Sequence, residues 1–339
     1  MSKDDFHYFD AGDVRLQSGL CYRRAKLAYK TYGRLDAARA NVIVYPTSFS
    51  AQHYDTEWLI GPGGVLDTDK YFVVIPNMFG NGLSSSPSNT PPPFDRGRYP
   101  HFTCYDNVQV QQRLLREVFG VDKIKLAYGW SMGAMQAYHW AALFPEAVER
   151  IAVVCGAART APHNFVFLEG VKAALTADPA WRDGWFETQP LRGLRAMGRI
   201  YAGWAMSQTW YRQELWRGTG HASLEDYLVA AWEGNFLRRD ANDLLAHIWT
   251  WQHGDISANE IYRGKLEAAL GAIRARVLLM PSASDLYFTV ADNEAELPQL
   301  RVAKLRVIPS VWGHRAGNPA GQPEDTEFIR REVAALLEE

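Results

Sequence analysis

Apolar residues in the first half of the chain fall into short continuous runs separated by polar and helical segments. Such runs occur at residues 41–46, 71–76, 124–128 and 151–155, and a continuous apolar run is typical of a strand buried on both faces of a parallel sheet. Between them, residues 106–119 carry apolar side chains at helical spacing. This alternation predicts an α/β fold with a mostly parallel sheet flanked by helices.

The amino-terminal segment has a different pattern. Residues 6–30 alternate between apolar and polar side chains, which predicts two antiparallel strands. We place the turn between them at residues 10–13, Asp-Ala-Gly-Asp, and expect the second strand to be clearest at residues 26–32.

The pattern changes again after Gly156. The sequence from 159 to 265 has helical spacing without a convincing strand, and it holds eight of the twelve tryptophans. Residues 276–280 then return to the pattern of a buried strand, followed by a strand at 303–308 and a helix at 324–337. The predicted organisation is a first core part (1–158), an inserted helical cap or lid (159–265) and a second core part (266–339).

Composition indicates an ordinary globular protein. The 339 residues are 47% hydrophobic and 22% charged, and 36 basic against 38 acidic residues give a formal charge of −2, so we expect no nucleic-acid partner. The amino terminus lacks the apolar core of a signal peptide, and no apolar run approaches membrane-spanning length. We therefore expect a cytoplasmic protein with no membrane partner.

The cysteines add little chemistry. Cys21, Cys104 and Cys155 are widely scattered and have no metal-ligand spacing. An odd, scattered set is typical of buried thiols in a reducing compartment. We expect neither a disulfide framework nor a metal site.

The segment between the third apolar run and the helix that follows it carries the clearest chemical motif. Gly129-Trp130-Ser131-Met132-Gly133 fits the pattern G-x-S-x-G, and it lies between the predicted strand at 124–128 and a predicted helix at 134–143. In this strand–turn–helix context the pattern is a nucleophile elbow, which exposes the serine oxygen above the sheet. Small residues flank the serine because the turn is tight. Ser131 is the predicted nucleophile.

A serine hydroxyl needs an imidazole to take its proton and a carboxylate to orient that imidazole. On α/β-hydrolase folds the order along the chain is Ser, Asp or Glu, then His, with the last two on loops after late strands. Asp285 follows the strand that ends at Met280, and His314 follows the strand that ends at Ile308. We predict Ser131, Asp285 and His314 as the catalytic residues, with Asp292 as an alternative acid.

Acyl transfer also needs two backbone donors for the oxyanion. The elbow geometry assigns the first to the amide of Met132, and the second to the loop after the first buried strand, near Ser48. Phe49 is one position further on and is the alternative second donor. Four other histidines could line the pocket, and the sequence does not distinguish between them: His53, His101, His163 and His247.

Several long segments resemble one known family. These are LAYKTYGRLDAARANVIVYP, LIGPGGVLDTDKYFVVIPNMFGNGLSSSPS, RYPHFTCYDNVQVQQRLLREVFGV, GWSMGAMQAYHWAALFPE and YLVAAWEGNFLRRDANDLL. Over nearly its whole length the chain resembles the homoserine O-acetyltransferases of the α/β-hydrolase superfamily. The resemblance implies an α/β-hydrolase fold with a helical cap over the site, and commonly a homodimer. It also implies two-step acyl transfer through an acyl-serine, with acetyl-CoA as co-substrate and no other cofactor.

The chain differs from that family at the positions expected to bind the molecule that accepts the acyl group. Where the family has an aspartate after the catalytic histidine, thought to engage the acceptor's ammonium, this chain has Arg315. The charge reversal should repel an ammonium. The family's His-Ala-Leu-Thr-Gly loop is Pro-Thr-Ser-Phe-Ser at residues 46–50. We expect a substrate other than homoserine, in a pocket that includes Phe49, Trp130 and Arg315.

Three hypotheses of function follow. The first is a serine-nucleophile hydrolase of a small ester or related acyl compound, because the triad is complete while the amino-acid acceptor motif is lost. The second is an acetyl-CoA-dependent O-acyltransferase, and the third a non-catalytic ligand-binding protein on the hydrolase fold. The cap tryptophans either contact an apolar substrate or pack the cap on the core.

Overall fold

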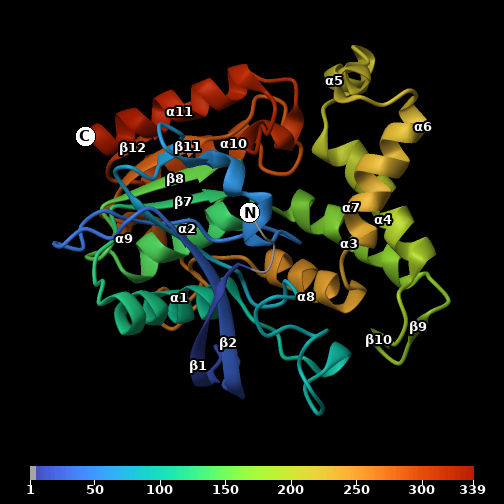
Figure 1. Cartoon of the computed structure of the whole chain (residues 1–339), viewed down its shortest axis with the longest axis horizontal. Coiled ribbons are helices and arrows are strands. Elements are labelled where there is room, and N and C mark those ends of the chain that lie inside the picture. Colours follow the sequence, from blue (N-terminus) through green and yellow to red (C-terminus); the bar gives the residue numbers. More distant parts are fainter. Residues whose placement is uncertain (1–4) are drawn as a thin grey trace.

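The computed structural model describes residues 5–339 and is built around one eight-stranded sheet (Figure 1). Its strand order is β1-β2-β6-β3-β7-β8-β11-β12. From β6 to β12 all neighbours are parallel, while β2 pairs antiparallel with both β1 and β6. The strands are β1 His7–Arg15, β2 Cys21–Tyr32, β3 Val42–Val44, β6 Phe72–Pro76, β7 Leu126–Trp130, β8 Arg150–Val154, β11 Arg276–Met280 and β12 Ala303–Leu305. The predicted mostly parallel α/β sheet is confirmed.

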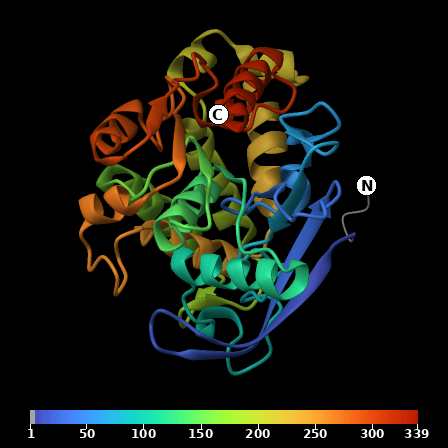
Figure 2. The same ribbon diagram turned by 90° about the vertical axis from the view of Figure 1, so that its left-hand side faces the viewer.

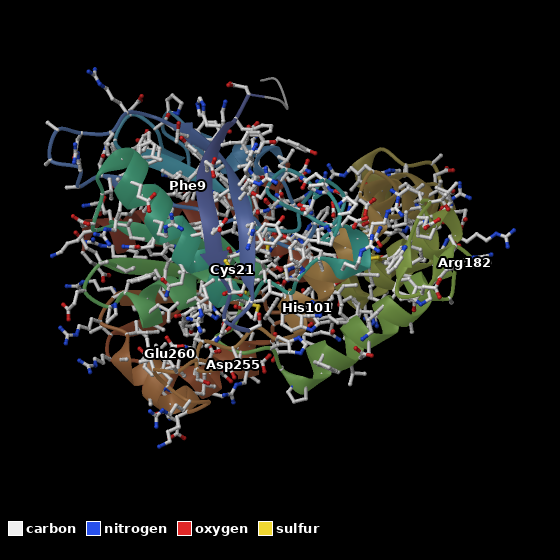
Figure 3. The ribbon with its side chains drawn as sticks, turned by 90° about the horizontal axis from the view of Figure 1, so that it is seen from below. Phe9, Cys21, His101, Arg182, Asp255 and Glu260 are labelled. Carbon is white, nitrogen blue, oxygen red and sulfur yellow. The ribbon has the colours of Figure 1, made fainter. Side chains whose placement is uncertain are left out.

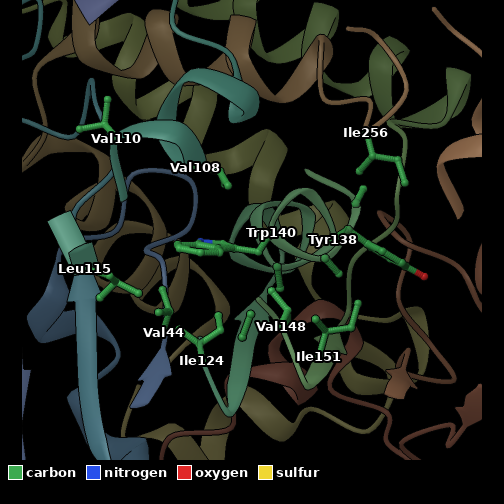
Figure 4. Close-up of a cluster of buried hydrophobic side chains, with 14 of the residues drawn as sticks. Val44, Val108, Val110, Leu115, Ile124, Tyr138, Trp140, Val148, Ile151 and Ile256 are labelled. Carbon is green, nitrogen blue, oxygen red and sulfur yellow. The ribbon is translucent and has the colours of Figure 1, made fainter. Parts of the chain in front are cut away.

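Helices cover both faces of this sheet, and alternate residues of the buried strands pack on opposite faces. On β3, Val44 joins the cluster around Trp140, whereas Ile43 joins the cluster around Ile329 and Val333 (Figure 4). Helices α1, α2 and α9 supply the first cluster and α11 the second. The core helices are α1 Cys104–Phe119, α2 Met132–Leu143, α9 Leu266–Ala272, α10 Val290–Glu296 and α11 Pro323–Glu338.

The amino-terminal hairpin forms one edge of the sheet (Figure 2). Its predicted turn at residues 10–13 is wrong. That segment lies inside β1 as an irregularity in the register around Gly12, whose amide donates to Asp10 Oδ1 at 3.0 Å. An Asx-type contact and a glycine at φ +62° therefore bulge the strand without ending it. The chain turns at residues 16–20, where Leu16 N–H donates to Leu20 O at 2.8 Å.

One expectation about the cysteines also fails. Cys104 and Cys155 are buried, but Cys21 is exposed at the start of β2 (Figure 3). The hairpin is an edge, so every second residue of its strands faces solvent.

Between β8 and β11 the chain forms a lobe of helices beside the sheet (Figure 1). The prediction that it holds no strand is wrong at one point, because β9 and β10 pair as a two-residue hairpin. Its elements are α3 Pro162–Thr176, β9 Trp181–Arg182, β10 Trp185–Phe186, α4 Leu191–Ala205, α5 Gln208–Arg212, α6 Leu224–Tyr227, a π-helical turn Leu228–Glu233, α7 Gly234–Leu237 and α8 Ala241–Gln252. The other short elements are β4 Ile60–Gly61, β5 Leu66–Asp67 and 3₁₀ turns at His53–Asp55, Glu57–Leu59, Arg96–Arg98, Leu215–Thr219, Leu297–Gln299 and Gly313–Gly317.

The two ends of this helical segment lie against each other. Thr160 N–H donates to Gly254 O at 2.8 Å, and Ile256 N–H donates to Ala158 O at 3.1 Å. Beyond this neck, a hydrophobic cluster joins cap residues such as Leu168 and Trp251 to Met132 and Met135 of the sheet-bearing part. The division at residues 159 and 265 stays a prediction. No helix among residues 5–339 is long and apolar enough to cross a membrane.

Candidate active site

Ser131 occupies a strained turn between β7 and α2. Its backbone has φ +58° and ψ −126°, a conformation that costs a residue with a side chain about 1–3 kcal/mol. The surroundings hold it there, because Ser131 N–H donates to Val154 O at 3.0 Å and Ala134 N–H donates to Ser131 O at 2.9 Å. The strand–elbow–helix order predicted from the sequence is therefore present, with α2 beginning directly after the serine.

The two glycines of the motif are required by space. A Cβ on Gly129 would lie 2.2 Å from Gly133 O, and one on Gly133 would lie 2.6 Å from Pro46 O. Each distance is shorter than van der Waals contact, and the opposing atom is backbone in both cases. The two glycines therefore allow the close backbone packing that places Ser131 above the sheet.

His314 and Asp285 meet at the carboxyl end of the sheet. His314 Nδ1 lies 2.8 Å from Asp285 Oδ2. The other oxygen of Asp285, Oδ1, accepts N–H bonds from Tyr287 at 2.8 Å and Phe288 at 3.3 Å. A carboxylate held at both oxygens fixes the proton on Nδ1, which leaves Nε2 of the imidazole as a proton acceptor.

The rival acid Asp292 has another role. Its Oδ2 accepts from Thr289 N–H at 2.9 Å and from Thr289 Oγ1 at 2.8 Å, in a capping box at the start of α10. The structure therefore places Asp285, and not Asp292, beside His314. This capping box could have been anticipated from the Thr-x-x-Asp spacing at residues 289–292.

Aromatic rings enclose the His314 imidazole. Trp130 stacks on it with ring centroids 5.0 Å apart, Tyr287 meets it edge-on at 4.7 Å, and Phe288 lies at 5.8 Å. Trp130 Nε1 also donates to His314 O at 3.2 Å. These contacts restrict the imidazole to one orientation.

Two serines that the sequence did not single out support the His314 loop. Ser284 Oγ accepts from Gly313 N–H at 3.0 Å and donates to Ser310 O at 2.8 Å. Ser310 Oγ accepts from Trp312 N–H at 3.1 Å and donates to Asp325 Oδ2 at 2.7 Å. Serine is too common in loops for this network to be found from the sequence.

The loop after β3 is tied to the elbow. Ser48 Oγ donates to Trp130 O, and Gly133 N–H lies 3.4 Å from the same hydroxyl. Within residues 5–339, the backbone N–H groups of Met132, Ser48 and Phe49 have no hydrogen-bond partner. Three unpaired donors thus lie around Ser131.

The His247 side chain is hydrogen-bonded to the loop after β3. Its Nδ1 accepts from Ser50 N–H at 3.1 Å, and its Nε2 donates to Phe79 O at 3.1 Å. Burial lowers the pKa of His247 to about 4, so the ring is neutral at pH 7 and keeps this tautomer. None of the four additional histidines named from the sequence lines the pocket above Ser131.

A cavity of about 260 Å³ lies above Ser131. Its lining includes Ser48, Phe49, Trp130, Ser131, His314 and Arg315, as expected, whereas Asp285 and Met132 are not part of the lining. The wall residues that the sequence did not indicate are Ser50, Ala51, Asp55, Tyr201, Ala205, Asn235, Phe236, Arg238, Tyr287, Asn318 and Ala320.

Aromatic side chains from distant elements form much of this wall. Phe49 stacks on Tyr201 with centroids 5.5 Å apart, and it contacts Trp251 at 5.7 Å. Trp232 and Trp251 line the cavity, but Trp210 and Trp216 are buried in the cap without lining it. Packing within the protein is therefore confirmed for Trp210 and Trp216, and contact of the cap tryptophans with a substrate stays a prediction.

One set of metal-type ligands coincides with the same site. In the described part of the chain, Cys155, Asp285 and His314 offer ligand atoms within 4.8 Å of one another. Burial raises the pKa of the Cys155 thiol, and a protonated thiol is a poor metal ligand. The Asp285 and His314 atoms already bind each other. The arrangement favours a His–Asp pair, and the absence of a metal stays a prediction.

Comparison with known proteins identifies the class. The profile of the alpha/beta hydrolase fold family matches residues 64–314. The chain belongs to the α/β-hydrolase family, and it is an enzyme of that family.

Within this family, the chain is similar to several esterases. A probable esterase of Corynebacterium glutamicum is 36% identical over 307 residues, covering 89% of this chain and 87% of the relative. The ethyl acetate hydrolase of Pseudomonas veronii is 34% identical over 312 residues, covering 91% and 89%. The crystal structure of an acetylester hydrolase from C. glutamicum superposes with a TM-score of 0.96 at 33% identity, covering 99% of this chain and 97% of that one.

Homoserine O-acetyltransferases are also relatives. The enzyme of Geobacter sulfurreducens is 30% identical over 337 residues, covering 90% of each chain. The resemblance to this family seen in the sequence is therefore confirmed, alongside greater similarity to the two hydrolases above.

Proposed function

We propose that the protein is a serine esterase that hydrolyses small acyl esters through an acyl-serine intermediate. The observation that carries the proposal is the convergence of the Ser131 elbow and the His314–Asp285 pair on one cavity. Two relatives at 34–36% identity carry hydrolase names, which supports water as the acyl acceptor.

In the first half-reaction Ser131 Oγ attacks the ester carbonyl carbon, and His314 Nε2 takes the hydroxyl proton. Asp285 stabilises the imidazolium that forms. The amides of Met132 and of Ser48, or of Phe49 in its place, donate to the developing oxyanion. His314 then returns the proton to the departing alcohol.

In the second half-reaction water takes the place of the alcohol. His314 removes a proton from it, and the oxygen of that water bonds to the acyl carbon. The bond between the acyl carbon and Ser131 Oγ then breaks, His314 returns its proton to Oγ, and the carboxylic acid leaves. In the described residues the Ser131 hydroxyl has no hydrogen-bond partner, which fits a nucleophile whose bond to the base tightens when substrate binds.

The cavity favours small substrates. Its volume of about 260 Å³ lies below the usual range of roughly 300–1,000 Å³ for drug-sized ligands. The aromatic part of the lining offers contact surface for apolar parts of the ester.

The second candidate is an acetyl-CoA-dependent O-acyltransferase, which the relative at 30% identity favours. The two share the acyl-serine and differ only in the molecule that attacks it. Purified protein is therefore assayed with p-nitrophenyl acetate and with acetyl-CoA, each with and without homoserine. Ester cleavage without release of CoA supports the esterase; release of CoA that requires homoserine overturns it.

Arg315→Asp tests the charge argument directly. If the acid of the acyltransferases is what their acceptor needs, this variant gains homoserine-dependent turnover. No gain means that Arg315 is not the determinant. A homodimer, a cytoplasmic location and independence from cofactors stay predictions, and light scattering after gel filtration tests the first.

A further inference from the structure

The Arg315 side chain is an unusual member of the cavity wall. It follows His314 directly in the turn Gly313–Gly317 and lines the cavity with Ser131. Its guanidinium lies 5.9 Å from the centre of the Trp130 ring, which itself stacks on His314. The Trp130 ring thus contacts both the Arg315 guanidinium and the His314 imidazole.

Arg315 has no ion pair or hydrogen bond through its side chain among residues 5–339. The titratable groups that act on it are the Asp55 carboxylate and the phenol of Tyr227, which is neutral because burial raises its pKa to about 12. Burial nevertheless lowers the pKa of Arg315 from its ordinary value. Arg315 is half-buried, so its guanidinium loses part of its hydration, and a single cation–π contact restores that loss only in part.

Asp55 is already engaged elsewhere. Its Oδ1 lies 3.0 Å from Arg238 and its Oδ2 lies 2.7 Å from Arg239. One carboxylate therefore faces three guanidinium groups, and Arg315 is the one without an ion pair to it. This end of the cavity has an excess of positive charge.

We propose that the ester substrate carries a carboxylate, on its acyl or its alcohol part, that pairs with the Arg315 guanidinium. The inference rests on the proposed esterase function and names the substrate class for that site. Arginine presents a planar fork of donors that matches a carboxylate. An anion there supplies the partner that the protein's own residues do not.

The test uses pairs of esters that differ by one atom or group. On the acyl side, monoethyl succinate is compared with ethyl 4-oxopentanoate, in which a methyl group replaces the carboxylate oxygen. On the alcohol side, 2-acetoxyacetate is compared with 1-acetoxypropan-2-one. Hydrolysis is followed as acid release, and the quantity compared is the ratio of kcat/KM for the acidic ester to that for its neutral partner.

In the wild-type protein we expect this ratio to favour the acidic ester in one of the two pairs. Arg315→Gln should lower that ratio by about tenfold to a hundredfold, as expected for loss of a charged hydrogen bond. Arg315→Lys keeps the charge but not the fork and should lose only about threefold. Arg238→Gln is the matched control, because that arginine lines the same cavity but is paired with Asp55; its ratio should change by less than about threefold.

Binding gives a second readout that needs no turnover. Monoethyl succinate and 2-acetoxyacetate are titrated into Ser131→Ala and into Ser131→Ala combined with Arg315→Gln, by calorimetry. Tighter binding of an acidic ester to the first variant, lost in the second, supports the proposal even if hydrolysis is too slow to follow.

The outcomes separate the two proposals. The carboxylate proposal is overturned if the kcat/KM ratios of wild type and Arg315→Gln are equal for both pairs of esters and both Ser131→Ala proteins bind the acidic esters equally. Arg315 would then be a residue that packs on Trp130. Failure of every ester, acidic and neutral alike, with or without Arg315, overturns the esterase instead.

Discussion

The elbow and the cavity wall are two regions of one site that are held in different ways. Ser131 is fixed by backbone strain, glycine packing and hydrogen bonds from neighbouring strands. The cavity wall is held by ring contacts between residues from four or more elements, such as Phe49 with Tyr201 and Trp251. The elbow is therefore specified by short spacing along the chain, and the wall only by the folded structure.

The elbow and the cavity wall differ in how many amino-acid substitutions they can accept. The elbow of this chain has no room for an added Cβ at Gly129 or Gly133, so these two positions are restricted to glycine. A wall of side-chain contacts can be rebuilt one residue at a time, because apolar replacements of similar volume cost little. Substitutions in the wall should therefore change substrate preference with less effect on the elbow.

The largest expected effect is at the elbow itself. Ser131→Ala and His314→Ala should each lower kcat/KM for p-nitrophenyl acetate by at least about 10⁴-fold, because triad members act as a unit. Thermal unfolding should be nearly unchanged. Ser18→Ala, an exposed serine in the hairpin turn, is the control and should keep full activity. Near-normal turnover by either variant contradicts the assigned roles.

The second prediction concerns stability and tests whether close backbone contacts require glycine at position 129 of the elbow. Gly129→Ala brings a Cβ to 2.2 Å from Gly133 O and should lower the free energy of unfolding by about 3 kcal/mol. Gly170→Ala is the matched control: it lies inside α3 with no atom within 4 Å of its Cβ. That change should raise stability by up to about 1 kcal/mol. Urea unfolding measures both, and a tolerated Gly129→Ala would refute the packing argument.

A third prediction concerns pH and the loop beneath the wall. Because the pKa of His247 falls to about 4 in the folded state and is about 6.5 when unfolded, the unfolded chain binds a proton first as pH falls. Stability from neutral His247 is therefore present above pH 6.5 and lost between 6.5 and 4. His247→Gln keeps an acceptor and a donor but does not titrate.

Between pH 7.5 and 5, wild type should lose about 2 kcal/mol more than His247→Gln. The comparison is made by urea unfolding at both pH values. The variant retains the other buried acids, Asp243 and Glu296, whose pKa values burial raises to about 7, so their effect cancels in the difference. A parallel pH dependence in the two proteins would show that His247 is not the titrating group.

The smallest effect is at the support of His314. Ser284→Ala removes the acceptor of Gly313 N–H and the donor to Ser310 O, and should cost about 1 kcal/mol of stability. It should also lower kcat more than it raises KM, because the imidazole loses part of its positioning. Ser284→Thr, which keeps the hydroxyl, should restore kcat. Lack of that rescue would mean that the hydroxyl does not position His314.

Much of the fold was accessible from the sequence, because buried parallel strands are continuous apolar runs and the elbow has a fixed spacing. The strand at Arg276–Met280 was predicted to the residue. The hairpin turn was not, because the Asp-Ala-Gly-Asp signal of a turn is also that of a bulge, and only pairing with β2 distinguishes them. The His–Asp pairing was expected from strand order, and the catalytic roles stay predictions.

The wall could not be predicted for a different reason. Tyr201, Phe236 and Tyr287 come from α4, α7 and the loop before α10, and nothing in their local spacing separates a lining aromatic from a packed one. The same holds for the cap tryptophans, of which only some reach the cavity. Arg315 was noticed only because it departs from a family pattern.

The neck at residues 158–160 and 254–256 has a consequence for how this molecule can be altered. Since the two ends of the helical segment are hydrogen-bonded to each other, no distance between strands sets its length, as for insertions whose ends meet. Its contacts with the rest of the chain, such as those of His247 with Ser50 and Phe79, do constrain its contents. A foreign helical segment joined at these positions would therefore have to reproduce the His247 contacts before it could present Ser131 with a different wall.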